Sequence, residues 1–249
     1  MQYLIPIIIF TYGAIFGSFF NVVILRTPKH ESLVTQSSHC PKCQAPIKPY
    51  DLIPILSYFI LRGKCRNCKN PISWRYPLIE SITGITFVWV YLVFGFSYQT
   101  IIGFVLTSIL IIVTVIDLDT MEILDRFQIL LFLLALINLL ISPLPLFEHL
   151  IGFFIISIPF FVIAYITGGI GGGDIKLIAM AGLLLGYKAT LVAFFIASIL
   201  GGLVAIYLLV SKQKERKSLI AFGPYLCIGV FLAYLYGNQI FSWYINFFS

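Results

Sequence analysis

The sequence predicts an all-α integral membrane protein that crosses the bilayer about eight times and carries one small polar domain. Of the 249 residues, 60% are hydrophobic and only 10% are charged, whereas soluble domains carry roughly 25% charged residues. The mean hydropathy is +1.01. The charged residues gather in a few short segments between long apolar runs. A soluble globular domain, a disordered chain and a secreted disulfide scaffold are therefore excluded.

The apolar runs set the number of membrane helices. Each helix needs about 20 residues to cross the hydrocarbon, and the chain outside the polar segment 26–75 has room for about eight. We expect them at residues 3–25, 77–95, 99–116, 127–142, 148–167, 175–187, 189–210 and 222–247. In the first, Gly13 and Gly17 indicate a close contact with another helix. The predicted domains are a first helix over 1–25, a cytosolic domain over 26–75 and a multi-helix membrane domain over 76–249.

The lysine and arginine residues predict the orientation, because they concentrate on the cytosolic side of membrane proteins. If segment 26–75 is cytosolic and the helices alternate, fifteen of the sixteen basic residues lie in the cytosol and only Lys188 lies outside. Both termini then lie outside. The membrane topology accounts for the net charge of +6, so we expect membrane lipid and no nucleic acid as a partner.

Four cysteines in the cytosolic segment form two C-x2-C pairs, Cys40 with Cys43 and Cys65 with Cys68. This spacing predicts a structural zinc site with four thiolate ligands. Two disulfides are the alternative, and the reducing cytosol disfavours them. A structural zinc site has no open position, so we expect a folding or docking module without chemistry of its own. Cys227, in the last predicted helix, is expected to be a buried apolar residue.

Two acidic sites lie at the predicted cytosolic face of the membrane, where carboxylates are candidates for function. The first site follows the third predicted helix and contains Asp117, Asp119, Glu122 and Asp125. The second is Asp174, directly after the glycine-rich run 168–173. Two carboxylates that share a site hold one proton between them, as in aspartic proteases. The sequence therefore predicts a membrane-embedded aspartic peptidase.

Spacing alone leaves the details of this site open. The partner of Asp174 could be Asp117, Asp119 or Asp125. Gly171, Gly172 and Gly173 are expected to supply main chain that a substrate can approach closely. Two structural interpretations compete with catalysis: Asp174 as an ordinary helix N-cap, and the first cluster as a solvated helix end. Lys176 is expected to extend to the lipid headgroups.

A series of short motifs runs through the chain from the first predicted helix to the glycine-rich run. In order they are Gly17-Ser18-Phe19, Asn21-Val22, Arg26, Pro28, the paired cysteines, Asp51-Leu52-Ile53-Pro54, Gly63-Lys64-Cys65-Arg66, Ile72-Ser73-Trp74-Arg75-Tyr76-Pro77, Glu80, Ile116-Asp117-Leu118-Asp119 and Gly171-Gly172-Gly173-Asp174-Ile175-Lys176. Taken together, these motifs resemble those of the type IV prepilin peptidases, which are membrane aspartic proteases of the GxGD type. The resemblance implies that Asp117 and Asp174 are the catalytic pair. It also implies cleavage after a glycine that ends a short basic leader and, in many members, N-methylation of the new terminus with S-adenosylmethionine.

The compact size and short loops are most similar to the late-competence leader peptidase of Gram-positive bacteria. The resemblance then implies a multi-pass plasma-membrane enzyme that acts on type IV prepilins or competence pseudopilins and supports pilus assembly, secretion or competence. We expect Asp119, Glu122 and Asp125 to attract the basic leader. Leu124 stands where the family usually has proline, so the helix before it is free to run on.

Two other classes of function remain as alternatives. One is a zinc-bearing membrane scaffold without enzymatic activity, in which Asp117 and Asp174 would not meet. The other is a cation or proton carrier. No carboxylate lies near the middle of a predicted helix, so the sequence shows no path for transport.

Overall fold

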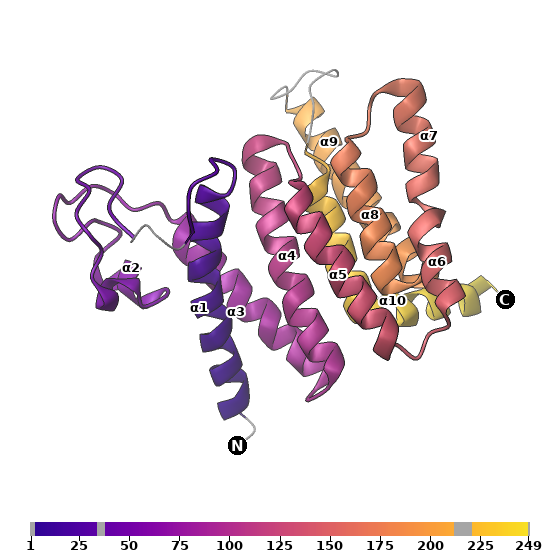
Figure 1. Ribbon diagram of the computed structural model, residues 1–249, viewed down its shortest axis with the longest axis horizontal. Helices are drawn as coiled ribbons and strands as arrows, with labels where there is room; N and C mark the ends of the chain where they lie inside the picture. The colour runs from indigo at the N-terminus through magenta and orange to yellow at the C-terminus, as the bar shows by residue number, and fades with distance from the viewer. Residues whose placement is uncertain (1–2, 34–37, 212–220, 249) are drawn as a thin grey trace. The chain divides into compact units, whose positions relative to one another are not determined.

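The computed structural model describes residues 3–33, 38–211 and 221–248, and these residues are predominantly helical (Figure 1). The all-α prediction is confirmed. The basic residues of segment 212–217, which enter the predicted orientation, lie outside the described residues. The helices are α1 (Leu4–Arg26), the 3-10 turn η1 (Pro49–Leu52), α2 (Leu56–Ile60), α3 (Arg75–Phe94), α4 (Tyr98–Thr120), α5 (Asp125–Ile141), α6 (Leu146–Ile155), α7 (Ser157–Thr167), α8 (Gly172–Leu185), α9 (Tyr187–Val210) and α10 (Gly223–Phe248).

All the apolar segments that the sequence predicts as crossings are helical, but they differ in length. Within the described residues, six helices are long and apolar enough to cross a membrane: α1, α3, α4, the α6–α7 pair, α9 and α10. The other two, α5 and α8, have 17 and 14 residues. The structure therefore supports a multi-pass membrane protein with at least six candidate crossings.

The chain divides into two compact units, residues 1–108 and 109–249. In the first unit, α1 packs along α3. A Cβ atom on Gly13 would lie 2.8 Å from the Cα atom of Gly84, and one on Gly17 would lie 2.7 Å from the Cα atom of Glu80. Only glycine permits this approach of the two backbones, which confirms the predicted role of Gly13 and Gly17.

The polar segment of the first unit contains two similar turns that carry the cysteine pairs. We call residues 38–74 the Cys module. Each turn closes with an isolated bridge, His39 with Pro46 and Lys64 with Pro71. The turn η1 and the short helix α2 connect the two halves.

The second unit is built around α8, which packs against α5, α6, α7, α9 and α10. Gly152 of α6 and Gly182 of α8 meet so closely that neither has room for a Cβ atom. The C-terminal carbonyl groups of α8 also find partners: Nδ1 of the buried His149 lies 2.8 Å from O of Leu183, and Nδ2 of Asn138 donates to O of Leu184 at 3.0 Å. These contacts fix α8, which carries Asp174 in its first turn.

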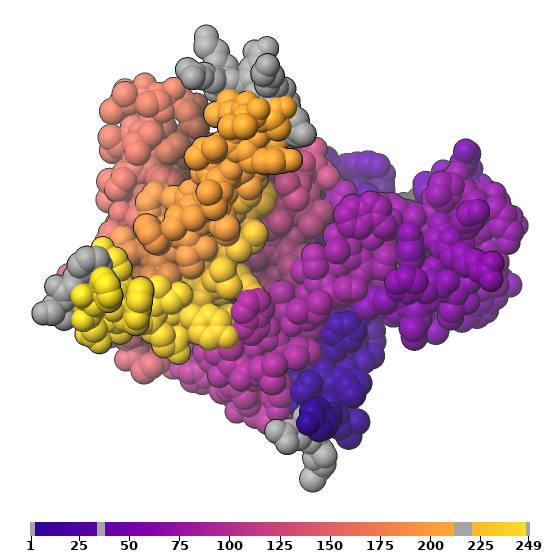
Figure 2. Space-filling view, turned by 180° about the vertical axis from the view of Figure 1, so that it is seen from behind, coloured from indigo at the N-terminus to yellow at the C-terminus, as the bar shows by residue number. Residues whose placement is uncertain are grey.

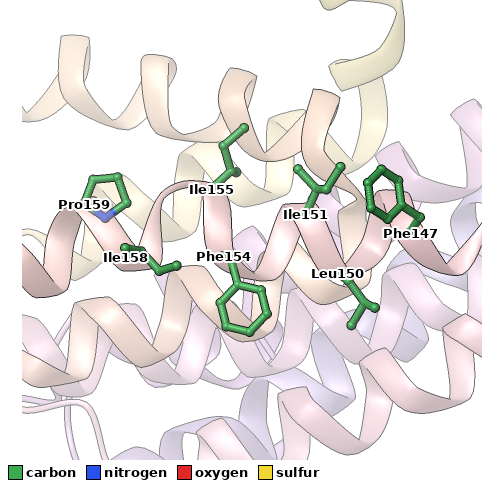
Figure 3. A pocket seen from close by; sticks show the side chains of 7 residues that line it. All are labelled: Phe147, Leu150, Ile151, Phe154, Ile155, Ile158 and Pro159. Carbon is green, nitrogen blue, oxygen red and sulfur yellow. The ribbon is translucent and has the colours of Figure 1, made fainter.

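The fifth predicted crossing is interrupted at Ile156, between α6 and α7. Pro159 explains the interruption, because it has no N–H to donate to the carbonyl group of Ile155, four residues earlier. A shallow groove of about 490 Å³ runs along this pair, and Figure 3 shows the side chains that line it. All of these side chains are apolar: Phe147, Leu150, Ile151, Phe154, Ile155, Ile158 and Pro159. The groove holds no group for chemistry, which must come from elsewhere in the unit.

Candidate active site and metal centre

Burial separates the four acidic residues of the first cluster. Asp117, in the last turn of α4, is only 5% exposed. Asp119, Glu122 and Asp125 are exposed. The interpretation as a solvated helix end therefore holds for these three residues and fails for Asp117. Since a buried carboxyl group is costly without a function or a partner, Asp117 is the catalytic candidate of this cluster.

Asp174 lies in the first turn of α8, and the interpretation as an N-cap is wrong. The residue in the capping position is Gly171, and no side chain caps the helix. Oδ1 of Asp174 is buried and has no hydrogen-bond partner among the described residues. Gly173, directly before Asp174, and Gly223, whose backbone lies against Asp117, both pack on the side chain of Ile123. The structure thus brings together two residues that are 57 positions apart in the chain.

The side chain of Ile123, in the link between α4 and α5, holds this site together. A Cβ atom on Gly173 would lie 2.9 Å from Cβ of Ile123, and one on Gly223 would lie 3.2 Å from its Cδ1. Gly223 begins α10, and its backbone also lies against Asp117: a Cβ atom there would be 2.5 Å from Oδ2 of the carboxylate. Glycines at 173 and 223 therefore leave the space that Ile123 and Asp117 occupy.

Sequence reasoning missed Gly223, although a glycine directly before a proline at the start of an apolar run is a visible signal. The three glycines of the motif also differ from one another. A Cβ atom on Gly171 would meet Oδ2 of Asp174 at 3.2 Å, whereas one on Gly172 would meet nothing within 4 Å. Close packing is thus required at Gly173 and, less tightly, at Gly171.

Gln128 is a further polar residue of the site that sequence reasoning missed. It lies in the first turns of α5 and is only 4% exposed. Its Nε2 donates to the carbonyl oxygen of Gly173 at 3.1 Å, directly before Asp174. Oε1 of Gln128, Oδ2 of Asp117 and Oδ1 of Asp174 are all buried without a partner among the described residues. Buried acceptors of this kind normally receive hydrogen bonds, so these three oxygens are suited to accept from donors such as water or a peptide N–H.

Three expectations about the surroundings of the site need correction. Lys176 does not extend to headgroups: its Nζ lies 2.6 Å from Oδ1 of Asp125 and ties the start of α8 to the start of α5. Asp125 is therefore partly neutralised by Lys176, and attraction of a basic leader stays a prediction. The helix before Leu124 does not run on, since α4 ends at Thr120. Leu124 has φ −69° and ψ 132°, a conformation that the usual proline would also adopt.

The four cysteine sulfur atoms of the Cys module lie within 4.8 Å of one another, and all four residues are free thiols. The Sγ atoms of Cys40 and Cys68 are 3.8 Å apart. A zinc ion with four sulfur ligands at about 2.3 Å has a tetrahedral edge of about 3.8 Å, so the cluster fits this ion. Backbone N–H groups of the first turn point at the sulfurs, which lowers the pKa of the Cys40 and Cys43 thiols and favours the thiolate form that a metal binds.

An ion pair connects the two halves of the Cys module. Arg66 donates from Nε and Nη2 to both carboxylate oxygens of Asp51, at 2.8 and 2.7 Å. This fork-shaped pairing holds the pKa of Asp51 below its ordinary value. The guanidinium group also lies over the ring of Tyr50, 5.3 Å from its centre. The turn η1 is thereby fixed to the second cysteine turn.

Comparison with known proteins identifies both units. Residues 11–94 match the bacterial peptidase A24 N-terminal domain, and residues 104–206 match the type IV leader peptidase family. A prepilin leader peptidase/N-methyltransferase of Bacillus subtilis (strain 168) is 39% identical over 96% of this chain and 97% of its own length. The proteins of the same name from Neisseria gonorrhoeae and Pseudomonas aeruginosa are 35% and 33% identical over 94% of this chain and 92% and 91% of their own lengths. No solved structure matches. The chain belongs to the type IV leader peptidase family.

Proposed function

We propose that the chain is an integral-membrane aspartic endopeptidase that removes the leader from type IV prepilins or pseudopilins. The observation that carries this proposal is that Asp117 and Asp174 each place one carboxylate oxygen in a buried position without a hydrogen-bond partner among the described residues. Full-length similarity to prepilin leader peptidase/N-methyltransferases supplies the substrate class. Among these substrates, the short loops favour competence pseudopilins.

One of the two carboxyl groups would act as the general base and the other as the general acid. Buried at close range, they hold one proton, since two adjacent charges are costly away from water. The ionised carboxylate takes a proton from a water molecule as its oxygen attacks the carbonyl carbon of the scissile peptide. The protonated partner donates its proton to the carbonyl oxygen, which gives a tetrahedral intermediate with two hydroxyl groups. The first carboxyl group then gives the proton that it took from water to the amide nitrogen, and the second takes a proton back from one hydroxyl group as the C–N bond breaks and the amine leaves.

The Cys module would bind one structural zinc ion through Cys40, Cys43, Cys65 and Cys68. Four thiolates complete a tetrahedral shell, so the ion would stabilise the module and take no part in hydrolysis.

The relatives are also N-methyltransferases, and we propose that this chain methylates the new terminus with S-adenosylmethionine. The described residues contain no glycine-rich strand-to-helix turn of the kind that binds nucleotide cofactors, so we assign no residue to this cofactor.

We further propose eight crossings of a bacterial plasma membrane, with both termini outside and with the Cys module and both aspartates at the cytosolic face. The arrangement of lysine and arginine residues supports this topology. In it, α5 and α8 cross as short helices whose ends meet the interfacial region. The domains would then be the first helix over 1–25, the cytosolic domain over 26–75 and the membrane peptidase domain over 76–249.

The test is cleavage of a purified prepilin-like substrate by the full chain in lipid nanodiscs. We expect Asp117→Asn and Asp174→Asn each to abolish cleavage, and mass spectrometry of the wild-type product to place the cut after a glycine. Asp119→Asn is the matched control, because Asp119 is exposed on the same helix. It should keep cleaving, with a higher KM at most, since Asp119 is expected to attract the leader and not to take part in the chemical step. Bound zinc and thermal unfolding show that each variant is folded. Cleavage that persists in both variants would refute the proposed pair, and a wild type that never cleaves would favour the scaffold.

A further inference from the structure

The Cys module exposes an unusual run of apolar side chains. Residues 52–61 contain no charged residue. In α2, the side chains of Leu56, Phe59 and Ile60 are 60%, 67% and 71% exposed. Leu52 and Ile53, just before this helix, are 42% and 45% exposed. A contiguous apolar patch on a polar module normally marks a contact surface.

The position of this run along the membrane helices indicates what covers it. The N–H of Ile55 donates to Oε2 of Glu80 at 2.7 Å. Glu80 lies in α3, five residues beyond its start at Arg75, which corresponds to about 7.5 Å along the helix. Helices that lie in the membrane interface place their apolar face about 5–10 Å into the boundary between headgroups and acyl chains.

The charges on either side of the run match an anionic lipid surface. Lys48 precedes it, and Arg62 and Lys64 follow it, all three exposed. The acidic residue of this part of the module, Asp51, is paired with Arg66. Basic residues that flank an apolar segment are typical of interfacial membrane anchors, because lipid phosphates attract them. In the space-filling view of Figure 2, the Cys module (purple) forms a lobe beside α1 and α3.

We propose that residues 48–64, which we call the α2 anchor, insert into the membrane interface. Leu56, Phe59 and Ile60 enter the boundary between headgroups and acyl chains, and the flanking lysine and arginine side chains bind the phosphate groups of anionic lipids. Glu80 fixes the depth of the anchor through its hydrogen bond to Ile55. The anchor holds the cysteine cluster close to the bilayer surface, and it does so independently of the aspartate pair.

The test uses a single tryptophan as a depth probe in the full chain. Trp74, Trp89 and Trp243 are replaced by phenylalanine, and Phe59→Trp is added. In nanodiscs of phosphatidylglycerol and phosphatidylcholine, we expect lipids brominated near the headgroup to quench about half or more of the emission, and acrylamide in water to quench little. The matched control is Lys42→Trp in the first cysteine turn, where acrylamide should quench strongly and brominated lipid should not. Bound zinc shows that both variants keep the module folded.

Two outcomes would overturn the proposal. Strong quenching of Phe59→Trp by acrylamide alone would place α2 in water. Protection from both quenchers would place it against protein, either another part of the chain or a second copy. A separate experiment tests the basic side chains. Adding Arg62→Gln and Lys64→Gln to the Phe59→Trp protein should reduce quenching by brominated lipid only in nanodiscs that contain phosphatidylglycerol. Equal quenching with and without this lipid in the otherwise unaltered Phe59→Trp protein would refute the proposed contacts with anionic headgroups.

Discussion

The cysteine cluster and the aspartate pair both unite distant parts of the chain, but they depend on the rest of the fold in different ways. Each C-x2-C turn closes locally: the N–H of Cys40 donates to O of Ala45 at 3.0 Å, and the N–H of Cys65 donates to O of Asn70 at 2.8 Å. Asp117 and Asp174, in contrast, meet only through the packing of α4, α5, α8 and α10 around Ile123. A metal site built from local turns can therefore be predicted from spacing, whereas the supports of the aspartate pair cannot.

The sharpest way to test this contrast is Gly223→Ala, which changes no charged residue. The new Cβ atom would lie 2.5 Å from Oδ2 of Asp117, so the carboxylate must move. A displacement of about 1 Å lowers turnover about 100-fold. We expect that loss in kcat for prepilin cleavage, with little change in KM. Gly202→Ala is the control, since a Cβ atom there meets nothing within 4 Å; equal losses in both variants would show general destabilisation.

Metal removal should affect the other region and leave the second unit folded. Cys68→Ser removes one of the four proposed ligands, so we expect less than about half of the wild-type zinc content. Limited proteolysis should then cut within residues 38–74, while the thermal unfolding of the membrane helices changes little. Collapse of the helices of the second unit on loss of zinc would contradict the independence of the two sites.

The glycine motif offers a finer comparison between neighbouring positions. A Cβ atom on Gly173 would lie 2.9 Å from Cβ of Ile123, but one on Gly172 would meet nothing within 4 Å. We expect Gly173→Ala to lower kcat by about 30-fold, because the turn before Asp174 must shift. Gly172→Ala should cost clearly less. The reverse order, measured in the same cleavage assay, would mean that the glycines serve substrate approach rather than packing.

Gln128→Leu should produce a smaller loss, since it removes one hydrogen bond to the carbonyl oxygen of Gly173. The net value of such a bond corresponds to about a tenfold change. We expect this change in kcat and an altered pH profile of cleavage, because the carboxyl group of Asp174 would be held less firmly. An unaltered pH profile together with lower thermal stability would indicate a structural role alone.

The smallest expected effect concerns Arg66→Lys in the Cys module. Lysine keeps the charge but cannot pair with both oxygens of Asp51, and exposed ion pairs contribute little. We expect zinc to dissociate to a chelator about two to five times faster, within the range for such a pair. Lys48→Gln is the control. An unchanged rate of zinc release in Arg66→Lys would show that the two cysteine turns need no support from η1.

The sequence predicted much of the fold because its signals are local. All eight segments that the apolar runs indicated are helical, and the pair Gly13 and Gly17 indicated the contact of α1 with α3. The break at Ile156 was missed, although Pro159 is a visible signal for it, because proline cannot donate a hydrogen bond to the carbonyl group of Ile155. The spacing of the acids left the partner of Asp174 open, because exposure depends on which helices cover a residue. Gln128 and Gly223 act through neighbours 45 and 106 positions away, a relation that no periodicity shows.

The proposed peptidase activity requires Asp117 and Asp174 to act as one unit. The most direct measurement is the rate of prepilin cleavage by Asp117→Asn, Asp174→Asn and the double variant, each in nanodiscs with zinc content and folding verified. Residues that act as a unit give grossly non-additive losses. We therefore expect each single variant to lose nearly all activity and the double variant to lose no more. Independent losses that multiply in the double variant would contradict a shared site.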